Sequence, residues 1–247
     1  MHCPICAANC LPIGVVAFNK CCNDRTQAVL PRSGVGISYV LCEQCSFCFA
    51  PEFAGWSLED FEARIYNAEY VLVDPDYVDA RPRANASSLL ATFGDRGKEI
   101  RHLDYGGGGG LLSKLLREKG WQSESYDPFV DRSVSVPELG RFDLVTAYEV
   151  FEHVPDVRRL VADLASLLNP EGVVLFSTLL SDGNVSPWYP LTWWYAAPRN
   201  GHISLFSAKS LAALGAIEGF AVGSFSQDLH AYWKNIPTWA AHILRPA

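Results

Sequence analysis

The stretch IRHLDYGGGGGLLSKLL, residues 100–116, decides the fold of this chain. A short apolar segment ends in Asp104, five glycines follow from Gly106 to Gly110, and a leucine-rich segment begins directly after them. This pattern predicts a strand, a turn in which the backbone is approached closely, and a helix that buries its leucines. A flexible linker is the alternative for a glycine run, but a linker does not stand between a strand and an amphipathic helix.

Beyond the glycines, predicted strands and helices alternate along the chain. The segment 157–172 is the clearest helix, because its apolar residues recur at helical spacing. The alternation predicts a parallel-type sheet with helices on both faces. Strands are expected at residues 99–106, 121–127, 141–151, 173–180 and 221–233, and helices at residues 110–120, 157–172 and 207–220.

The residues between the N-terminal cysteines and this domain are expected to form a helical connecting segment. Residues 56–70 read as a helix with Ser57 as its N-cap, and residues 83–94 as a second helix that ends at Gly94. The predicted organisation is therefore a module at 1–50, a connecting or cap segment at 51–97, and the main domain at 98–247.

Composition limits the classes of protein that this chain can represent. It has 247 residues, of which 49% are hydrophobic and 19% charged, as in soluble globular proteins. The net charge of −7 argues against a broad nucleic-acid surface. No apolar run is long enough for a membrane span, and the first residues lack the pattern of a secretory signal. A cytoplasmic protein is the expectation.

All eight cysteines lie between Cys3 and Cys48, which marks a boundary near residue 50. Two Cys-x-x-Cys pairs each place two sulfurs on one side of a tight turn, and two such pairs are typical of a four-cysteine zinc site. A disulfide framework is the alternative, but no secretion signal supports it. Cys48 in place of Cys45, and a second site with Cys21 or Cys22, stay open. The predicted zinc ligands are Cys3, Cys6, Cys42 and Cys45.

The glycine run does not fit the dinucleotide fingerprint G-x-G-x-x-G in any register, but it fits D-x-G-x-G-x-G. With the motifs SYDP at 125–128 and FDLVTAYEVFEHVPD at 142–156, the chain resembles the class I S-adenosylmethionine-dependent methyltransferases over roughly residues 96–230. The resemblance implies an α/β fold with a Rossmann-like seven-stranded sheet, helices on both faces, and the methyl donor at the C-terminal strand ends. The third strand of the family falls in a short segment, residues 128–143, which offers only Asp131 and Glu138 for adenine.

The resemblance also implies which residues bind S-adenosylmethionine. The glycines allow the methionine part of the donor to approach the backbone, and Asp104 interacts with its ammonium group. Asp127 accepts hydrogen bonds from the ribose hydroxyls, or alternatively forms a turn before Pro128. Tyr70 precedes the first strand and is a weaker candidate. The full expected set is Asp104, Tyr105, Gly106, Gly108, Gly110, Asp127, Pro128, Tyr148, Glu149 and Tyr70.

The expected reaction is SN2 methyl transfer to a small-molecule acceptor such as a sugar or another hydroxylated metabolite. His153 is a candidate general base, or alternatively Glu152 and His153 cap and orient the loop before the next helix. Residues 181–206 interrupt the alternation with many aromatic side chains and are expected to form a lid. Tyr195, Arg199 and His202 in this insert are candidates for acceptor binding, and the alternative is that the aromatic residues pack the lid.

Two other functions remain open. Zinc modules accompany this fold in some sugar methyltransferases and in some ribosomal-RNA methyltransferases. Residues 1–50 contain only Lys20, Arg25 and Arg32 as basic residues, which is little positive charge for RNA. A non-catalytic protein that binds the donor is the other alternative. The sequence does not indicate an oligomeric state.

Overall fold

The computed structural model describes residues 1–22, 30–31 and 33–244. Asp24, Arg25 and Arg32 therefore lie outside the described residues. Internal contacts divide the chain into two compact units. The first unit comprises Met1–Pro75, Phe151–Leu160 and Thr178–Leu214, and the second comprises Asp76–Val150, Val161–Ser177 and Gly215–Ala247.

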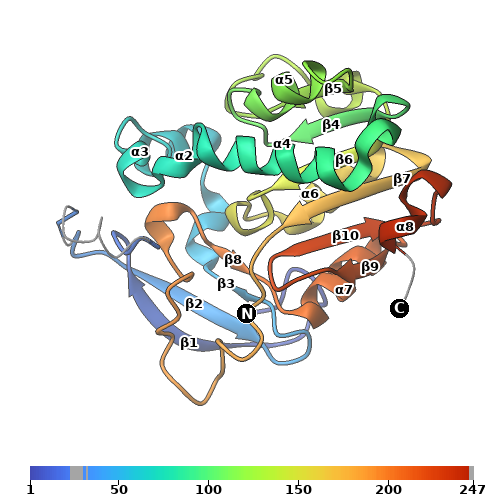
Figure 1. Ribbon diagram of the computed structural model, residues 1–247. Helices are drawn as coiled ribbons and strands as arrows, with labels where there is room; N and C mark the ends of the chain where they lie inside the picture. The colour runs from blue at the N-terminus through green and yellow to red at the C-terminus, as the bar shows by residue number, and fades with distance from the viewer. Residues whose placement is uncertain (23–29, 32, 245–247) are drawn as a thin grey trace. The chain divides into compact units, whose positions relative to one another are not determined.

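The second unit contains a six-stranded sheet in the order β5-β4-β6-β7-β10-β9 (Figure 1). The pairs β4–β5, β4–β6 and β6–β7 are parallel, whereas β10 is antiparallel to both of its neighbours. The α/β methyltransferase fold is thus confirmed, with a mixed sheet. Its strands are β4 (Arg101–Tyr105), β5 (Gln122–Tyr126), β6 (Phe142–Tyr148), β7 (Leu168–Ser177), β9 (Ala221–Ser224) and β10 (Leu229–Trp233).

The expected seventh strand does not form in the part of the chain that the structure describes. Between β5 and β6 the chain makes turns and the short 3-10 helix η4 (Val136–Leu139). This segment has a proline at the start of η4 and a capping box between Ser135 and Glu138, both of which favour a helical turn over a strand. Residues 221–233, expected as one strand, form the hairpin of β9 and β10.

The helices of the second unit follow the predicted apolar pattern. α4 (Ala80–Phe93) ends at Gly94, and α5 (Leu111–Arg117) starts directly after the glycines. Their buried faces pack with strand residues such as Leu144 in one core cluster. The remaining elements that begin or end in this unit are η3 (Gly94–Lys98), η7 (Thr238–Ala240), α6 (Val157–Ser166), α7 (Ala208–Ile217) and α8 (Ala241–Leu244).

The predicted helix 157–172 is shorter than expected. Its apolar residues are buried as the spacing predicts, but α6 ends at Ser166 and β7 begins at Leu168. The expected helix extends too far because Asn169, Pro170 and Gly172 are poor helix formers. The backbone from Leu168 onward belongs to β7, and Leu168 pairs with Phe142 of β6.

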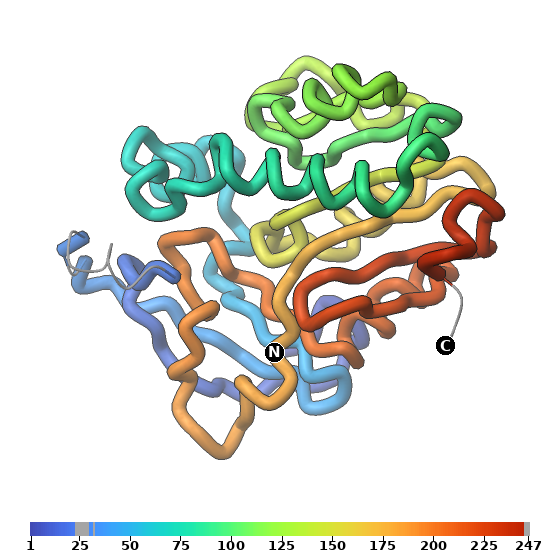
Figure 2. Tube along the Cα trace, in the orientation of Figure 1, coloured from blue at the N-terminus to red at the C-terminus, as the bar shows by residue number. Residues whose placement is uncertain are grey.

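The first unit contains a four-stranded sheet in the order β1-β2-β3-β8. Strand β3 pairs with β8. The cysteine-rich segment and the aromatic insert 181–206 therefore contribute strands to the same sheet, and the trace in Figure 2 shows the chain returning to this sheet. Ser57 caps α2 in a capping box with Asp60, as expected. The elements are β1 (Cys10–Ala17), β2 (Gly36–Cys42), β3 (Cys48–Phe49), β8 (Ser204–Leu205), η1 (Pro51–Gly55), α2 (Leu58–Arg64), α3 (Tyr70–Val73), η5 (Phe151–His153) and η6 (Pro198–Asn200), and η2 (Pro75–Tyr77) follows α3.

Across the residues that the structure describes, no helix combines the length and the apolar character that crossing a bilayer requires.

Candidate functional site

The loop between β4 and α5 has an alternating backbone conformation. Gly106, Gly108 and Gly110 have φ angles of 77°, 52° and 72°. These are the three glycines of the D-x-G-x-G-x-G pattern, and side chains other than glycine rarely adopt such angles. The pattern in the sequence therefore reflects a backbone requirement at every second position of the loop.

Gly107 is required by the lack of space for a side chain and not by its backbone conformation. A Cβ atom on Gly107 would lie 2.3 Å from Ser125 Oγ and 2.6 Å from Asp104 Oδ2, which is too close for any side chain. Around Gly108 and Gly109, by contrast, no atom lies within 4 Å of where a Cβ would be. One side of the loop is thus tightly packed and the other is open, as close approach of a ligand to the backbone requires.

Asp127 follows β5 and connects two loops. Its Oδ2 accepts a hydrogen bond of 2.9 Å from the Gly108 amide, and its Oδ1 accepts one of 2.8 Å from the Phe129 amide. The Asp127 amide in turn donates to Asp131 Oδ2 over 2.9 Å. The carboxylate is half-buried, and each of its oxygens has a second lone pair for a ligand hydroxyl. Asp127 therefore forms the turn that was the alternative interpretation, and it also keeps the capacity to bind a ribose.

Asp104 lies at the end of β4 and is 5% exposed. Burial raises the pKa of Asp104 to about 7, and the hydrogen bond from Thr146 opposes this increase. Thr146 Oγ1 donates to Asp104 Oδ1 over 2.9 Å and lies 3.0 Å from Nε2 of His102. Ser123 Oγ lies 2.7 Å from Nδ1 of the same ring. Burial lowers the pKa of His102 to about 3, so a neutral imidazole extends the hydrogen-bond chain to Asp104.

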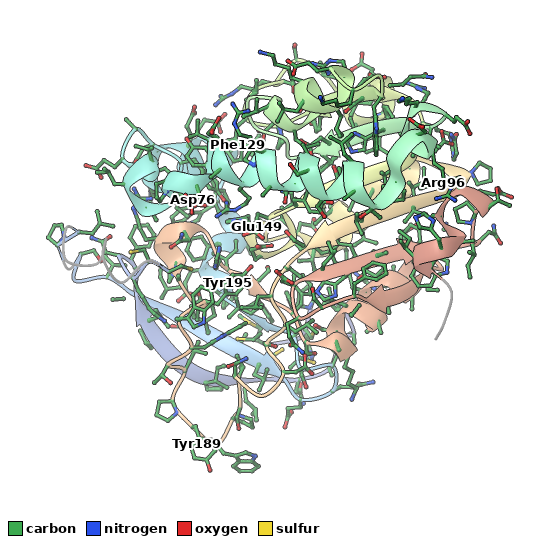
Figure 3. The ribbon with its side chains drawn as sticks, viewed as in Figure 1. Asp76, Arg96, Phe129, Glu149, Tyr189 and Tyr195 are labelled. Carbon is green, nitrogen blue, oxygen red and sulfur yellow. The ribbon has the colours of Figure 1, made fainter. Side chains whose placement is uncertain are left out.

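The end of β6 is conformationally strained. Glu149 has a φ of 54°, which is unusual for a residue with a side chain and is characteristic of functional sites. Ser177 at the end of β7 supports it twice, because the Ser177 hydroxyl accepts from the Glu149 amide and donates to Glu149 Oε1, each over 2.8 Å. Tyr148 packs against the core cluster, and burial raises its pKa. Figure 3 labels Glu149.

The other residues expected at the donor site have clear structural contacts. Tyr105 is buried, and its ring centroid lies 5.4 Å from that of Tyr126. Pro128 is half-buried in the turn that Asp127 forms. Of the two acids considered for adenine, Glu138 is occupied in the capping box of η4, whereas Asp131 lies beside Asp127.

The first unit brings together the predicted catalytic residues. Tyr195 is 5% exposed, and its hydroxyl donates a hydrogen bond of 2.5 Å to Oε1 of Glu152, which is fully buried. The ring of Tyr195 also lies on that of His202, with 4.1 Å between centroids. His153 lies 5.0 Å from His202, centroid to centroid. Tyr195 is labelled in Figure 3.

Other predicted residues of the first unit form structural hydrogen bonds. Tyr70 donates to the backbone oxygen of Asn200 over 3.2 Å, and it belongs to a different unit from the glycine loop. Arg199 is 3% exposed, and its guanidinium donates to the Ile65 oxygen over 2.6 Å and to Asn67 Oδ1 over 3.1 Å. Arg199 thereby ties the aromatic insert to the end of α2.

The aromatic insert has two kinds of residues. Trp193 and Tyr195 are buried, as the packing alternative expects, whereas Trp188 and Tyr189 are 84% and 75% exposed. Tyr189 points away from the rest of its unit at the tip of a loop (Figure 3).

The four predicted cysteines form one cluster. Their sulfurs lie within 4.8 Å of one another, with 3.6 Å between Cys3 and Cys45 and 3.4 Å between Cys6 and Cys42. A disulfide requires about 2.05 Å, so these contacts are not disulfides. Sulfurs bound tetrahedrally to zinc at about 2.3 Å are about 3.8 Å apart, which these separations approach.

The two Cys-x-x-Cys turns have the same backbone design. Ala7 and Ser46, which directly follow the second cysteine of each pair, have φ angles of 62° and 59°. In each turn the residue at this position donates to the oxygen of the first cysteine, over 2.9 Å from Ala7 to Cys3 and 3.1 Å from Ser46 to Cys42. The two turns thus present the four sulfurs with the same local backbone geometry.

A family model described as a methyltransferase domain matches residues 77–224. This chain belongs to that family. The matched residues of the methyltransferase domain include the glycine loop, Asp127 and the strained Glu149. The resemblance inferred from the sequence motifs is thereby confirmed.

Several curated relatives carry the name ubiquinone biosynthesis O-methyltransferase. The protein from Idiomarina loihiensis is 36% identical over 121 residues, which cover 39% of this chain and 48% of the relative. That from Coxiella burnetii strain Dugway is 33% identical over 106 residues, or 34% of this chain and 44% of the relative. The matched segments thus span less than half the length of these relatives. Among solved structures, an O-methyltransferase family protein from Burkholderia thailandensis aligns with a TM-score of 0.49 at 18% identity, covering 72% of this chain and 63% of that one.

Some residues of the site gave no signal in the sequence. Thr146 and His102 lie inside predicted strands. A polar side chain there is expected only as part of the alternating strand pattern and not as a residue of the site. Ser177 ends its strand and was likewise given no role. Glu152 stands in a predicted motif but was considered only as a partner of His153 in the loop. Thr146 and Ser177 lie near the carboxyl ends of the parallel strands β6 and β7, where a polar residue is the signal, whereas His102 near the start of β4 has no such signal.

The raised pKa of Asp104 predicts a pH dependence of stability. Folding favours the protonated carboxyl, so the folded chain binds more protons than the unfolded chain between about pH 4 and pH 7, and stability falls as the pH rises through this window. Replacing Asp104 by Asn keeps the acceptor for Thr146 and removes the titration. Urea unfolding at pH 5 and pH 8 should show a smaller loss of stability for Asp104→Asn than for the wild type. Equal losses in both proteins would contradict the assignment, and the exposed Asp76, changed to Asn, is the control.

Proposed function

We propose that this protein is an S-adenosylmethionine-dependent O-methyltransferase that acts on a small hydroxylated acceptor. The observation that carries the proposal is the glycine loop. It lies in the matched methyltransferase segment, Gly106, Gly108 and Gly110 are all left-handed, and Asp127 holds the loop through the Gly108 amide. The name of the relatives from Idiomarina loihiensis and Coxiella burnetii supports oxygen as the atom that is methylated.

The second unit supplies the donor-binding residues of this proposal. The open side of Gly108 and Gly109 accepts the methionine part of S-adenosylmethionine, Asp104 pairs with its ammonium group, and Asp127 binds the ribose hydroxyls. Tyr105, Pro128, Tyr148 and Glu149 line the same strand ends. When bound, the donor supplies a methyl group that is already activated on a sulfonium, so alignment with the acceptor accounts for much of the rate.

The acceptor is assigned to the polar cluster of the first unit. Tyr195, His153 and His202 lie together there with the buried Glu152, and they can hold and deprotonate a hydroxyl group. A sugar or another hydroxylated metabolite is the proposed class of acceptor. The net charge of −7 speaks against nucleic acid as the partner.

We further propose that Cys3, Cys6, Cys42 and Cys45 bind a structural zinc ion. The repeated turns and the sulfur separations support a tetrahedral site. The hydrogen bond between the Cys45 and Cys3 sulfurs lowers the pKa of Cys3, which favours the thiolate form that zinc binds. Free thiols of this kind persist in the cytoplasm, which is the proposed location.

Asp127→Ala is expected to weaken donor binding by about 1–3 kcal/mol, because charge-assisted hydrogen bonds to the ribose are lost. Isothermal titration of the purified protein with S-adenosylmethionine measures this effect. Asp95→Ala, which removes an exposed acid, is the control and should bind the donor as the wild type does. An unchanged affinity of Asp127→Ala would remove this residue from the donor site.

Turnover tests the function itself. Incubation with S-adenosylmethionine and a panel of catechols, phenols and sugars should release S-adenosylhomocysteine with at least one acceptor, and mass spectrometry should find the new methyl group on oxygen. Tight donor binding without any product over the panel would favour a non-catalytic donor-binding protein. Product formed on RNA alone would support the ribosomal-RNA alternative.

Cys42→Ser is expected to lower the zinc content by one ion per chain and to destabilise the first unit, because a three-cysteine site binds zinc less well. Metal analysis by mass spectrometry of native protein measures the content. Cys10→Ser is the matched control, since Cys10 lies near the cluster but outside the four ligands. Retention of zinc by Cys42→Ser would refute the assigned ligands.

A further inference from the structure

We propose that Glu152, His153 and His202 form a second metal site, which binds a divalent cation through one oxygen and two nitrogens. One ligand atom from each residue lies within 4.8 Å of the other two. Glu152 is fully buried, His202 is 5% exposed and His153 is half-buried. All three belong to the first unit. This site is distinct from the four cysteines in residues and in chemistry.

The spacing suits a metal ion. Ligand atoms on opposite sides of an ion that binds them at about 2.1 Å are about 4.2 Å apart, so a maximum separation of 4.8 Å needs only a small closure. Two imidazoles and one carboxylate suit first-row divalent metals such as Mn²⁺, Fe²⁺ and Zn²⁺. Three protein ligands leave further positions for water or substrate, as in catalytic rather than structural metal sites.

Outer hydrogen bonds orient two of the ligands. The Tyr195 hydroxyl donates to Oε1 of Glu152 over 2.5 Å, and Nδ1 of His202 lies 3.0 Å from the backbone oxygen of Tyr195. A carbonyl accepts only, so this contact places the His202 proton on Nδ1 and leaves the lone pair on Nε2. Metal-bound histidines are commonly held in this way, with the second nitrogen bonded to a backbone oxygen. Tyr195 thus orients two of the ligands, Glu152 through its hydroxyl and His202 through its backbone oxygen.

The third ligand is oriented by Tyr66, whose hydroxyl lies 3.1 Å from Nδ1 of His153. Gly201 has a φ of 87°, and a Cβ there would lie 2.7 Å from the Tyr66 hydroxyl and 2.8 Å from Nδ1 of His153. The residue before His202 must therefore be glycine if Tyr66 and His153 are to keep their contact.

The backbone fixes the distance between the two halves of the site. The Ile203 amide donates to the backbone oxygen of Glu152 over 2.9 Å. This hydrogen bond connects the residue after His202 to η5. On the other side, the Tyr39 hydroxyl donates to the His202 oxygen over 2.7 Å. Ligands that are far apart in sequence are thereby held in place without the metal, as expected of a preformed site.

The consequence for catalysis rests on the proposed function. With a divalent ion bound, His153 and His202 would hold the ion rather than act as bases. The ion would lower the pKa of an acceptor hydroxyl, whose proton would pass to solvent, and the new O–C bond would form as the S–C bond of the donor breaks.

Mn²⁺ titration tests the site, because this ion prefers nitrogen and oxygen ligands to thiolates. The full chain is dialysed against a chelator, and free Mn²⁺ is followed by electron paramagnetic resonance. The wild type should bind one ion per chain. Glu152→Gln keeps an acceptor for Tyr195, and both this variant and His153→Asn should bind at least tenfold more weakly. The exposed His242, changed to Asn, is the control, and Cys42→Ser should still bind Mn²⁺.

The absence of saturable Mn²⁺ binding in the wild type, or equal affinity in Glu152→Gln, would overturn the proposal. A circular dichroism spectrum and a thermal unfolding midpoint equal to those of the wild type show that each variant is folded. Failure of the metal site and failure of the proposed function give different results. Methyl transfer that persists in excess chelator would reject the metal while the methyltransferase stands. Specific Mn²⁺ binding without transfer to any acceptor would leave the site and reject the activity.

Discussion

The hydrogen bond from the Gly108 amide to Asp127 is the contact on which the donor site depends. It joins the loop after β4 to the turn after β5, and these are neighbouring parallel strands. Parallel strands place their carboxyl ends at one edge of the sheet, but the loops that follow are free to diverge. A carboxylate that receives amides from both loops prevents this. The left-handed glycines are the means by which the amide of Gly108 is turned toward Asp127.

The loop and the order of the strands and helices could be predicted from the sequence, because both follow from local rules. The alternating glycines, the buried spacing of α6 and the capping box at Ser57 need only neighbours within a few residues. The errors concern segments for which the local sequence allowed more than one secondary structure. The third strand is replaced by η4, which a proline and a capping box favour locally. β7 begins where a helix was expected, because Leu168 pairs with Phe142 of β6.

Site residues were predicted where the motif itself contains them. They were missed where a residue contributes only by a hydrogen bond to another site residue. Asp104 was expected, whereas Thr146 and His102, which connect to it, were not. Similarly Tyr195 and His202 were expected, but the role of Glu152 as the acceptor of the Tyr195 hydroxyl was not. The hydrogen-bonded partners Thr146 and Asp104 are 42 residues apart in sequence, and Tyr195 and Glu152 are 43 apart. Only the folded chain shows that they share a hydrogen bond.

The first unit contains two clusters of side chains of the kinds that bind metals, and the chemistry of the two clusters differs. Soft thiolates favour zinc and exclude hard ions, whereas a carboxylate with two imidazoles accepts ions that keep open positions. The sheet links the clusters, since Cys48 of β3 pairs with Leu205 of β8, three residues after His202. A zinc ion in the four-cysteine site would therefore stabilise the sheet to which the acceptor-side residues are attached. Ligand type alone would direct each ion to its own site, while the backbone contacts of Glu152 and His202 hold the second site in place without the zinc.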